Sequence, residues 1–138
     1  MIDPVFLSVA DVHSLHADQL ERYGGSPGLR DEGALHAAVE MARATFDGEY
    51  LHADLFSMAA AYAFHIAESQ SFVDGNKRTG LNAALVFLLI NGWQVLDPDG
   101  RLYDAMIAIA VHTLDKAGLA KLFEELAVPD EDNEKKAF

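Results

Sequence analysis

The sequence contains no cysteine, few cations and no apolar run long enough to cross a membrane. Without cysteine the chain cannot form disulfides or thiolate metal sites, and this composition is typical of a cytoplasmic protein. The longest apolar segment, 80–90, is shorter than the roughly 18 residues that a membrane-spanning helix needs. The first residues, Met-Ile-Asp-Pro, lack the basic region of a signal peptide. We therefore expect a cytoplasmic protein without a membrane partner.

Positive charge is scarce: 10 Lys and Arg stand against 22 Asp and Glu, for a net charge of −12. A surface of this sign repels phosphate backbones, which argues against direct nucleic-acid binding, and it suits a basic protein partner. Part of the acidity lies in the last nine residues. Against this background the adjacent cations Lys77 and Arg78 mark a local positive site.

The length of 138 residues and the 51% apolar content predict one domain with a substantial core. We place this domain at 1–128 and a charged tail, with the composition of a disordered segment, at 129–138. Alanine and leucine are abundant and β-branched alternation is scarce, so the pattern predicts an all-α fold. We expect six helices, at about 8–23, 31–43, 53–69, 77–91, 102–113 and 118–126.

The third and fourth of these helices are apolar on almost every side, which places them at the centre of a compact bundle. A loop is expected at 45–52, a short extended piece at 93–96 and a turn at 97–100. The segment between the two central helices is rich in polar and charged residues. Charge is poorly placed between two core helices unless the loop opens onto a pocket.

This segment, 70–79, reads Gln-Ser-Phe-Val-Asp-Gly-Asn-Lys-Arg-Thr. The first N–H groups of a helix lack partners within the helix and attract anions, phosphate above all. Gly75 lets the backbone approach a ligand closely, and Lys77 and Arg78 add full positive charges. Asp74 beside them suits Mg²⁺, which prefers one or two carboxylates with phosphate oxygens and water. The constellation predicts a Mg²⁺–nucleotide site.

The alternative is an ordinary capping turn, with Asp74 or Asn76 as the cap and both cations in solvent. Short glycine motifs occur often by chance. However, two cations at a helix N-terminus oppose the helix dipole, which favours a bound anion that compensates them.

Residues 72–79 resemble the signature of the Fic/Doc family, H-x-F-x-[D/E]-[G/A]-N-[K/G]-R. The segment 22–33 resembles the first loop of the Doc (death-on-curing) branch, and 54–56 and 91–93 also fit this branch. Fic adenylyltransferases carry G-N-G-R-x-x-R. Here Lys77 replaces the middle glycine and Leu81 stands at the second arginine, so the resemblance is to Doc.

The resemblance implies an all-α fold and transfer of a phosphate-containing group, from ATP with Mg²⁺, to a protein hydroxyl. Doc members are toxin kinases that phosphorylate a threonine of elongation factor Tu and stop translation. They are neutralised by an antitoxin whose C-terminal segment, Phd-like, folds on the toxin, and an apolar groove would suit such an amphipathic helix. Carried over by position, Asp74 would bind Mg²⁺, Gly75 would line the anion hole, and Asn76, Lys77 and Arg78 would hold phosphates.

Two positions depart from the family pattern. Gln70 stands where the family has its catalytic histidine, and Ser71 replaces the usual proline, whereas Phe72, the expected loop anchor, is present. A neutral amide can orient a hydroxyl but cannot accept its proton. General-base catalysis typically supplies about 10²–10⁴ in rate, so we expect a strongly weakened enzyme that retains nucleotide binding.

Two further alternatives stay open for the function. One is a non-catalytic module that binds nucleotide or a protein, and the less favoured one is an AMP transferase. His65, five residues before Gln70, is interpreted as a structural histidine packed near the motif, with a role as substitute base as the alternative. The other histidines are interpreted as structural or solvated: His13, His16, His36, His52 and His112.

Overall fold

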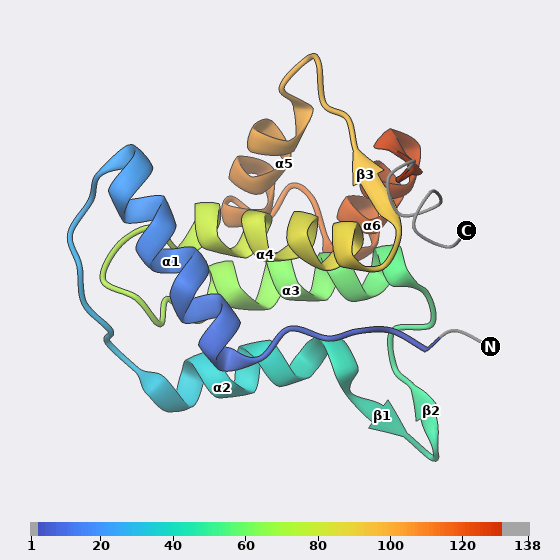
Figure 1. The fold of residues 1–138 in the computed structure, drawn as a ribbon, viewed down its shortest axis with the longest axis horizontal. Helices are drawn as coiled ribbons and strands as arrows, with labels where there is room; N and C mark the ends of the chain where they lie inside the picture. The colour runs from blue at the N-terminus through green and yellow to red at the C-terminus, as the bar shows by residue number, and fades with distance from the viewer. Residues whose placement is uncertain (1–2, 131–138) are drawn as a thin grey trace.

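The computed structural model describes residues 3–130, which form six α-helices, a short 3-10 helix and two small antiparallel strand pairs (Figure 1). The helices are α1 (Val9–Tyr23), α2 (Glu32–Glu40), the 3-10 helix η1 (Met41–Arg43), α3 (Leu55–Ser69), α4 (Asn76–Ile90), α5 (Arg101–Ala110) and α6 (Lys116–Leu126). The strands are β1 (Thr45–Phe46), β2 (Glu49–Tyr50), β3 (Trp93–Val95) and β4 (Ala127–Pro129). The mostly helical fold class expected from the sequence is confirmed.

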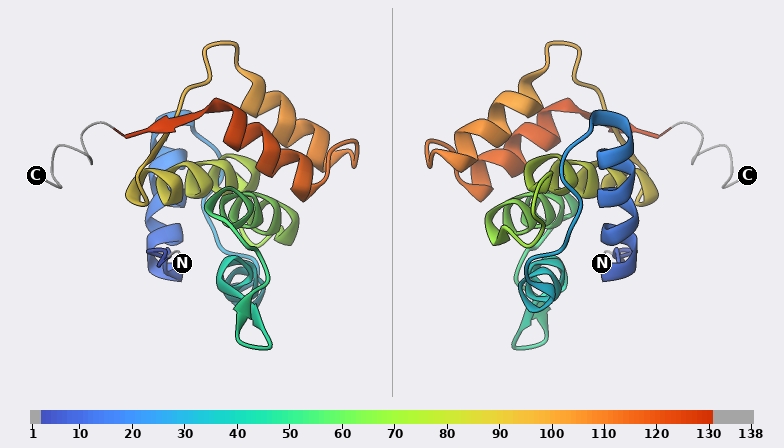
Figure 2. Two further views of the ribbon diagram at one scale, coloured as in Figure 1. Left: turned by 90° about the vertical axis from the view of Figure 1, so that its right-hand side faces the viewer. Right: turned by 90° about the vertical axis from the view of Figure 1, so that its left-hand side faces the viewer.

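Helices α3 and α4 lie side by side at the centre, with α1 and α2 on one side and α5 and α6 on the other (Figures 1 and 2). Every residue of α3 from Met58 to Ala63 is buried, which explains why the helix is apolar all round. A Cβ at Gly80 of α4 would lie 2.7 Å from the carbonyl oxygen of Ala63. The two central helices therefore touch backbone to backbone at this glycine.

Short polar side chains start most of the helices. Ser8 and Asp11 form a reciprocal capping box at α1. Asp31, Asp54 and Asp115 cap α2, α3 and α6 by accepting hydrogen bonds from backbone N–H groups three residues on. These caps mark where their helices begin. All six helices start within one or two residues of the positions expected from the sequence.

A β-hairpin occupies the segment 45–52, where the sequence indicated only a loop. Strands β1 and β2 pair antiparallel across Asp47 and Gly48, which both have positive φ, as this tight hairpin turn requires. Strands of two residues are too short to show apolar alternation, so the pattern could not reveal them.

The second strand pair, β3 with β4, joins the end of α4 to the end of α6. Gln94 is opposite Val128, and the N–H of Asp130 donates to the carbonyl oxygen of Gly92 at 2.9 Å. The charged tail was expected from 129 onward; Pro129 belongs to β4, and 131–138 lie outside the described residues. Within 3–130, none of the helices has the length and apolarity to cross a membrane.

Candidate phosphate-binding site

The loop between α3 and α4 begins at Gln70, which ends α3 in the left-handed conformation (φ 50°, ψ 36°). Its side-chain Nε2 donates to the carbonyl oxygen of Ala67 at 3.0 Å. A carbonyl can only accept, so the amide nitrogen must face Ala67, and the amide oxygen is left as a free acceptor. Gln70 therefore caps the C-terminal end of α3 with its own side chain.

The middle of the loop is held by Asn76, the first residue of α4. Its Oδ1 accepts from the N–H of Phe72 at 3.0 Å, and its Nδ2 donates to the Phe72 carbonyl oxygen at 2.9 Å. Both residues are buried, and the Phe72 ring is only 1% exposed. Asn76 was expected to hold phosphate, but its side chain bonds the loop, so its backbone N–H is the group left to face an anion.

The imidazole of His16, from α1, packs against the loop. Its ring stacks on Phe72 with a centroid distance of 3.7 Å and an interplanar angle of 8°, and its Nε2 donates to the carbonyl oxygen of Asp74 at 2.8 Å. The side chain is 6% exposed. The sequence reasoning interpreted His16 as structural or solvated, because nothing local signals a contact across 58 residues.

The segment after α1, 24–31, runs antiparallel beside the loop. Leu29 forms an isolated β-bridge with Phe72, and the N–H of Val73 donates to Gly28 at 3.0 Å. A Cβ at Gly25 would lie 2.9 Å from Oδ2 of Asp74 and would displace this carboxylate, and the φ of 121° at this position favours glycine. Residues 22–33, noted in the sequence for their resemblance to Doc, therefore pack directly on the motif.

The carboxylate of Asp74 is positioned by two backbone groups. Oδ1 accepts from the N–H of Gly75 at 2.9 Å, and Oδ2 accepts from the N–H of Ser26 at 3.2 Å. The side chain is exposed, and each oxygen keeps a further lone pair. Among the described residues no three His, Asp or Glu side chains form a metal cage. The donor set fits Mg²⁺, which takes one carboxylate and fills its other positions with phosphate oxygens and water.

The N-terminus of α4 presents the groups that bind an anion. Gly75 (φ 80°) is the N-cap, and no side chain caps the helix. The first helical hydrogen bond is made by the N–H of Thr79 to Gly75, so the three preceding N–H groups have no partner in the helix. Lys77 and Arg78 are exposed, and within 3–130 neither forms an ion pair. Positive charge at this point is therefore free to bind phosphate.

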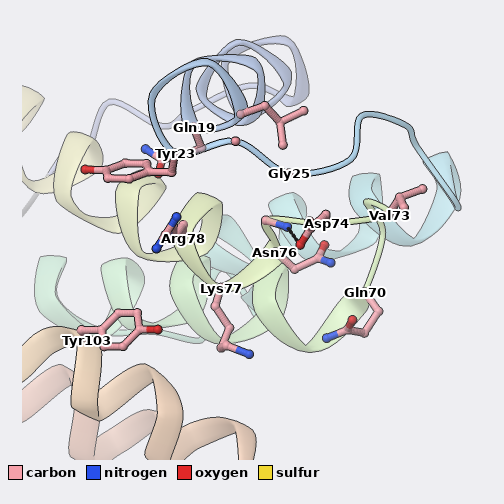
Figure 3. Close-up of a pocket in the computed structure, with 13 residues that line it drawn as sticks. Gln19, Tyr23, Gly25, Gln70, Val73, Asp74, Asn76, Lys77, Arg78 and Tyr103 are labelled. Atoms are coloured by element: carbon pink, nitrogen blue, oxygen red, sulfur yellow. Dashed lines mark hydrogen bonds between the residues drawn. The ribbon is translucent and has the colours of Figure 1, made fainter.

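A cavity of about 370 Å³ lies at this helix end (Figure 3). The structure brings to its lining six of the residues singled out in the sequence: Gln70, Asp74, Gly75, Asn76, Lys77 and Arg78. Phe72 lies beneath them in the core. Other side chains of the lining come from distant segments, among them Gln19 and Tyr23 of α1 and Tyr103 of α5, and no local pattern indicated their place at the site. The guanidinium carbon of Arg78 lies 4.4 Å from the centre of the Tyr23 ring.

His65 does not line the cavity. Its Nε2 accepts from the Lys116 ammonium at 3.0 Å, at the interface of α3 with α6. Burial, together with the charge of Lys116, lowers the pKa of His65 to about 4. The hypothesis that His65 replaces the missing base is wrong, because its acceptor nitrogen is already engaged elsewhere.

Comparison with known proteins agrees with this geometry. A model of the Fic/DOC family matches residues 6–88, which include the whole motif. "Protein kinase doc" of Escherichia phage P1 is 35% identical over 120 residues, covering 87% of this chain and 94% of the relative. "Toxin Doc" of Mycolicibacterium smegmatis (strain ATCC 700084 / mc(2)155) is 40% identical over 101 residues, covering 71% of this chain and 77% of the relative.

Proposed function

The chain belongs to the Fic/DOC family, and we propose that it is a Doc-type toxin that phosphorylates a hydroxyl of a translation factor of the elongation factor Tu type. The observation that carries this proposal is the cavity at the start of α4. There, unpartnered helix N–H groups, two cations without ion pairs and one carboxylate converge beside Gln70. These are the groups that hold the phosphates of MgATP.

The phosphates would lie on the backbone N–H groups of residues 76–78, where the helix dipole favours negative charge. Lys77 and Arg78 would neutralise the charge of the transferred group and of the leaving group. Asp74 is the residue that would hold Mg²⁺, since its carboxylate is exposed and already oriented by Ser26 and Gly75. A metal ion held by Asp74 would supply positive charge that stabilises the charge developing on the leaving group.

Gln70 stands where the target hydroxyl would enter. Its Nε2 is engaged with Ala67, so its Oε1 would accept a hydrogen bond from the hydroxyl and orient it. It cannot take the proton, so the rate would be about 10²–10⁴ below that with a general base. Phosphoryl transfer depends largely on positioning and charge, so a slow reaction remains.

The relatives named "Protein kinase doc" and "Toxin Doc" support the kind of partners that we propose. The target is a protein with a reactive hydroxyl, of the elongation factor Tu type. The neutralising partner is an antitoxin with a Phd-like C-terminal segment, and the net charge of −12 suits basic residues in that segment.

One observation supports the alternative of a non-catalytic binding module. Gln70 makes a structural hydrogen bond as the cap of α3, a role that needs no reaction. AMP transfer is less well supported, because Leu81, at the position of the second arginine of Fic enzymes, adds no charge for further phosphates.

The experiment compares the protein with its Gln70→His variant. Each is incubated with elongation factor Tu and ATP labelled at either the γ- or the α-phosphate, and each is expressed in bacteria. We expect γ-label on the target, slow for the natural chain and faster by about 10²–10⁴ for Gln70→His, with growth arrest in the variant. Gln70→Ala is the matched control for loss of the amide.

Three results would contradict the proposal. Transfer of the α-label would favour AMP transfer. ATP binding without transfer by either protein would favour a binding module. Full activity of the natural chain, unchanged in Gln70→His, would show that no base is needed at this position.

A further inference from the structure

A second depression adjoins the phosphate cavity on the side of α1 and α5. The two share four lining residues, Gln19, Tyr23, Arg78 and Tyr103, so they form one continuous surface. Figure 3 shows Tyr23 and Tyr103 on the same side of the site, with Arg78 between them. A ligand whose phosphate is bound at Arg78 therefore has this depression beside it, where the rest of the ligand can lie.

The chemistry of the depression differs from that of the cavity. Beyond Arg78, helix α4 contributes the apolar side chains of Leu81 and Leu85, and no other charged side chain lines the depression. Two amides, from Gln19 and Asn82, supply both hydrogen-bond donors and acceptors. The surface is therefore unsuited to further phosphates and suited to a planar ring with polar edges.

The two tyrosines flank the depression with exposed rings. Tyr23 is 61% exposed and Tyr103 is 53% exposed, although a large aromatic side chain is more often mostly buried. Neither ring stacks on another aromatic ring among the described residues. Exposed tyrosines beside a pocket offer stacking area with little loss of side-chain entropy.

Arg78 lines both the phosphate cavity and the adjoining depression. Tyr23 covers one face of its guanidinium at 4.4 Å, a contact that uses the face of the group and leaves its in-plane N–H donors for phosphate oxygens. The guanidinium is thereby held at the boundary between the polar cavity and the apolar depression.

We propose that the depression between Tyr23 and Tyr103 binds the heteroaromatic base of the nucleotide whose phosphates lie at the start of α4. The inference rests on the proposed function, because it takes the phosphate site as given. It adds the position of the base and two residues of base recognition, Tyr103 by stacking and Tyr23 by stacking and by orienting Arg78.

The test measures the affinity of the full-length protein for MgATP and for magnesium tripolyphosphate, which carries the phosphates without the base. Stacking of one base on an aromatic side chain is worth about 5-fold or more in affinity. We expect at least this preference for ATP in the natural chain. Tyr103→Ala should weaken binding of ATP more than binding of tripolyphosphate and so remove most of the preference, and Tyr103→Phe should retain it.

Ile107→Ala is the matched control, since Ile107 lies one turn further along α5, is 41% exposed and does not line either depression. Equal affinity for both ligands in the natural chain, or a preference that survives in Tyr103→Ala, would overturn the base site while leaving the proposed function intact. Failure of tripolyphosphate itself to bind would instead contradict the phosphate site of the proposed function.

Discussion

The imidazole of His16 and the backbone of Asp74 are joined by a hydrogen bond of 2.8 Å, from Nε2 to the carbonyl oxygen. The same ring lies flat on Phe72. One side chain of α1 thus holds two points of the motif loop, from 58 residues away in the chain. The position of the Asp74 carboxylate, on which metal binding depends in our proposal, is set by this contact as well as by the loop itself.

Replacing His16 should therefore affect both stability and ligand binding. His16→Ala removes the stacking and leaves the Asp74 carbonyl without its donor, so we expect a loss of about 2–4 kcal/mol in the free energy of unfolding. His16→Phe keeps an aromatic ring and loses only the hydrogen bond, with an expected cost of about 1–2 kcal/mol. Urea denaturation measures both.

The control is His36→Ala, whose exposed ring meets Glu32 on the surface of α2 and should change stability by less than about 0.5 kcal/mol. Equal stability of His16→Ala and the natural chain would show that the loop does not depend on this histidine.

Gly25 and Gly24 provide a matched pair for the approach of the 24–31 segment to Asp74. An alanine at Gly25 would place its Cβ 2.9 Å from the carboxylate, whereas a Cβ at Gly24 meets nothing within 4 Å. Both glycines have positive φ, so both substitutions carry a backbone cost of about 1–3 kcal/mol. Gly25→Ala should cost about 1–2 kcal/mol more than Gly24→Ala, as thermal or urea unfolding would reveal. Equal costs would mean that the loop moves aside freely.

Asn76 and Lys77 are neighbours in the chain, but we expect Asn76 to contribute to stability and Lys77 to contribute to phosphate binding. Asn76→Ala leaves the buried N–H and carbonyl of Phe72 without partners, which should cost about 2–4 kcal/mol of stability. Lys77→Ala removes an exposed cation, so stability should change by less than about 0.5 kcal/mol, while affinity for tripolyphosphate falls several-fold. The measurements are urea unfolding and tripolyphosphate affinity for both variants. A large loss of stability in Lys77→Ala, or none in Asn76→Ala, would contradict these roles.

Acid should destabilise the α3–α6 interface before the carboxylates titrate. Burial lowers the pKa of His65 to about 4, and burial also lowers the pKa of His52, both from an ordinary value of 6.5. As pH falls below 6.5 the unfolded chain takes up a proton at each histidine before the folded chain does. Stability is therefore lost below pH 6.5, and the loss that comes from His65 continues to about pH 4. Above pH 6.5 both histidines are neutral in either state, and they contribute no pH dependence.

The measurement is the urea midpoint at several pH values between 7 and 4. His65→Gln should flatten the loss of stability in that window. An identical slope in His65→Gln would contradict the assigned burial effect.

The helices, and the gathering of residues 74–78 at the start of one helix, could be predicted from the sequence because their causes are local. Apolar periodicity and capping residues lie within a few positions of the helices that they specify, and residues 74–78 are adjacent in the chain. The contacts of His16, Ser26 and Tyr103 with the site join segments far apart in the sequence, and no local pattern encodes them. The inward direction of the Asn76 side chain and the capping role of Gln70 depend on the loop conformation, which composition does not reveal.

The glycine contact between α3 and α4 has a consequence for how the site can change. Gly80 lies one turn after Asn76 and rests against the backbone at Ala63, so the spacing of the two helices near the loop is set without any side chain from the cavity. Because position 70 takes no part in this contact, exchanging its side chain leaves the helix spacing at Gly80 in place. In our proposal, a substituted proton acceptor and an intact anion site can therefore coexist in one chain.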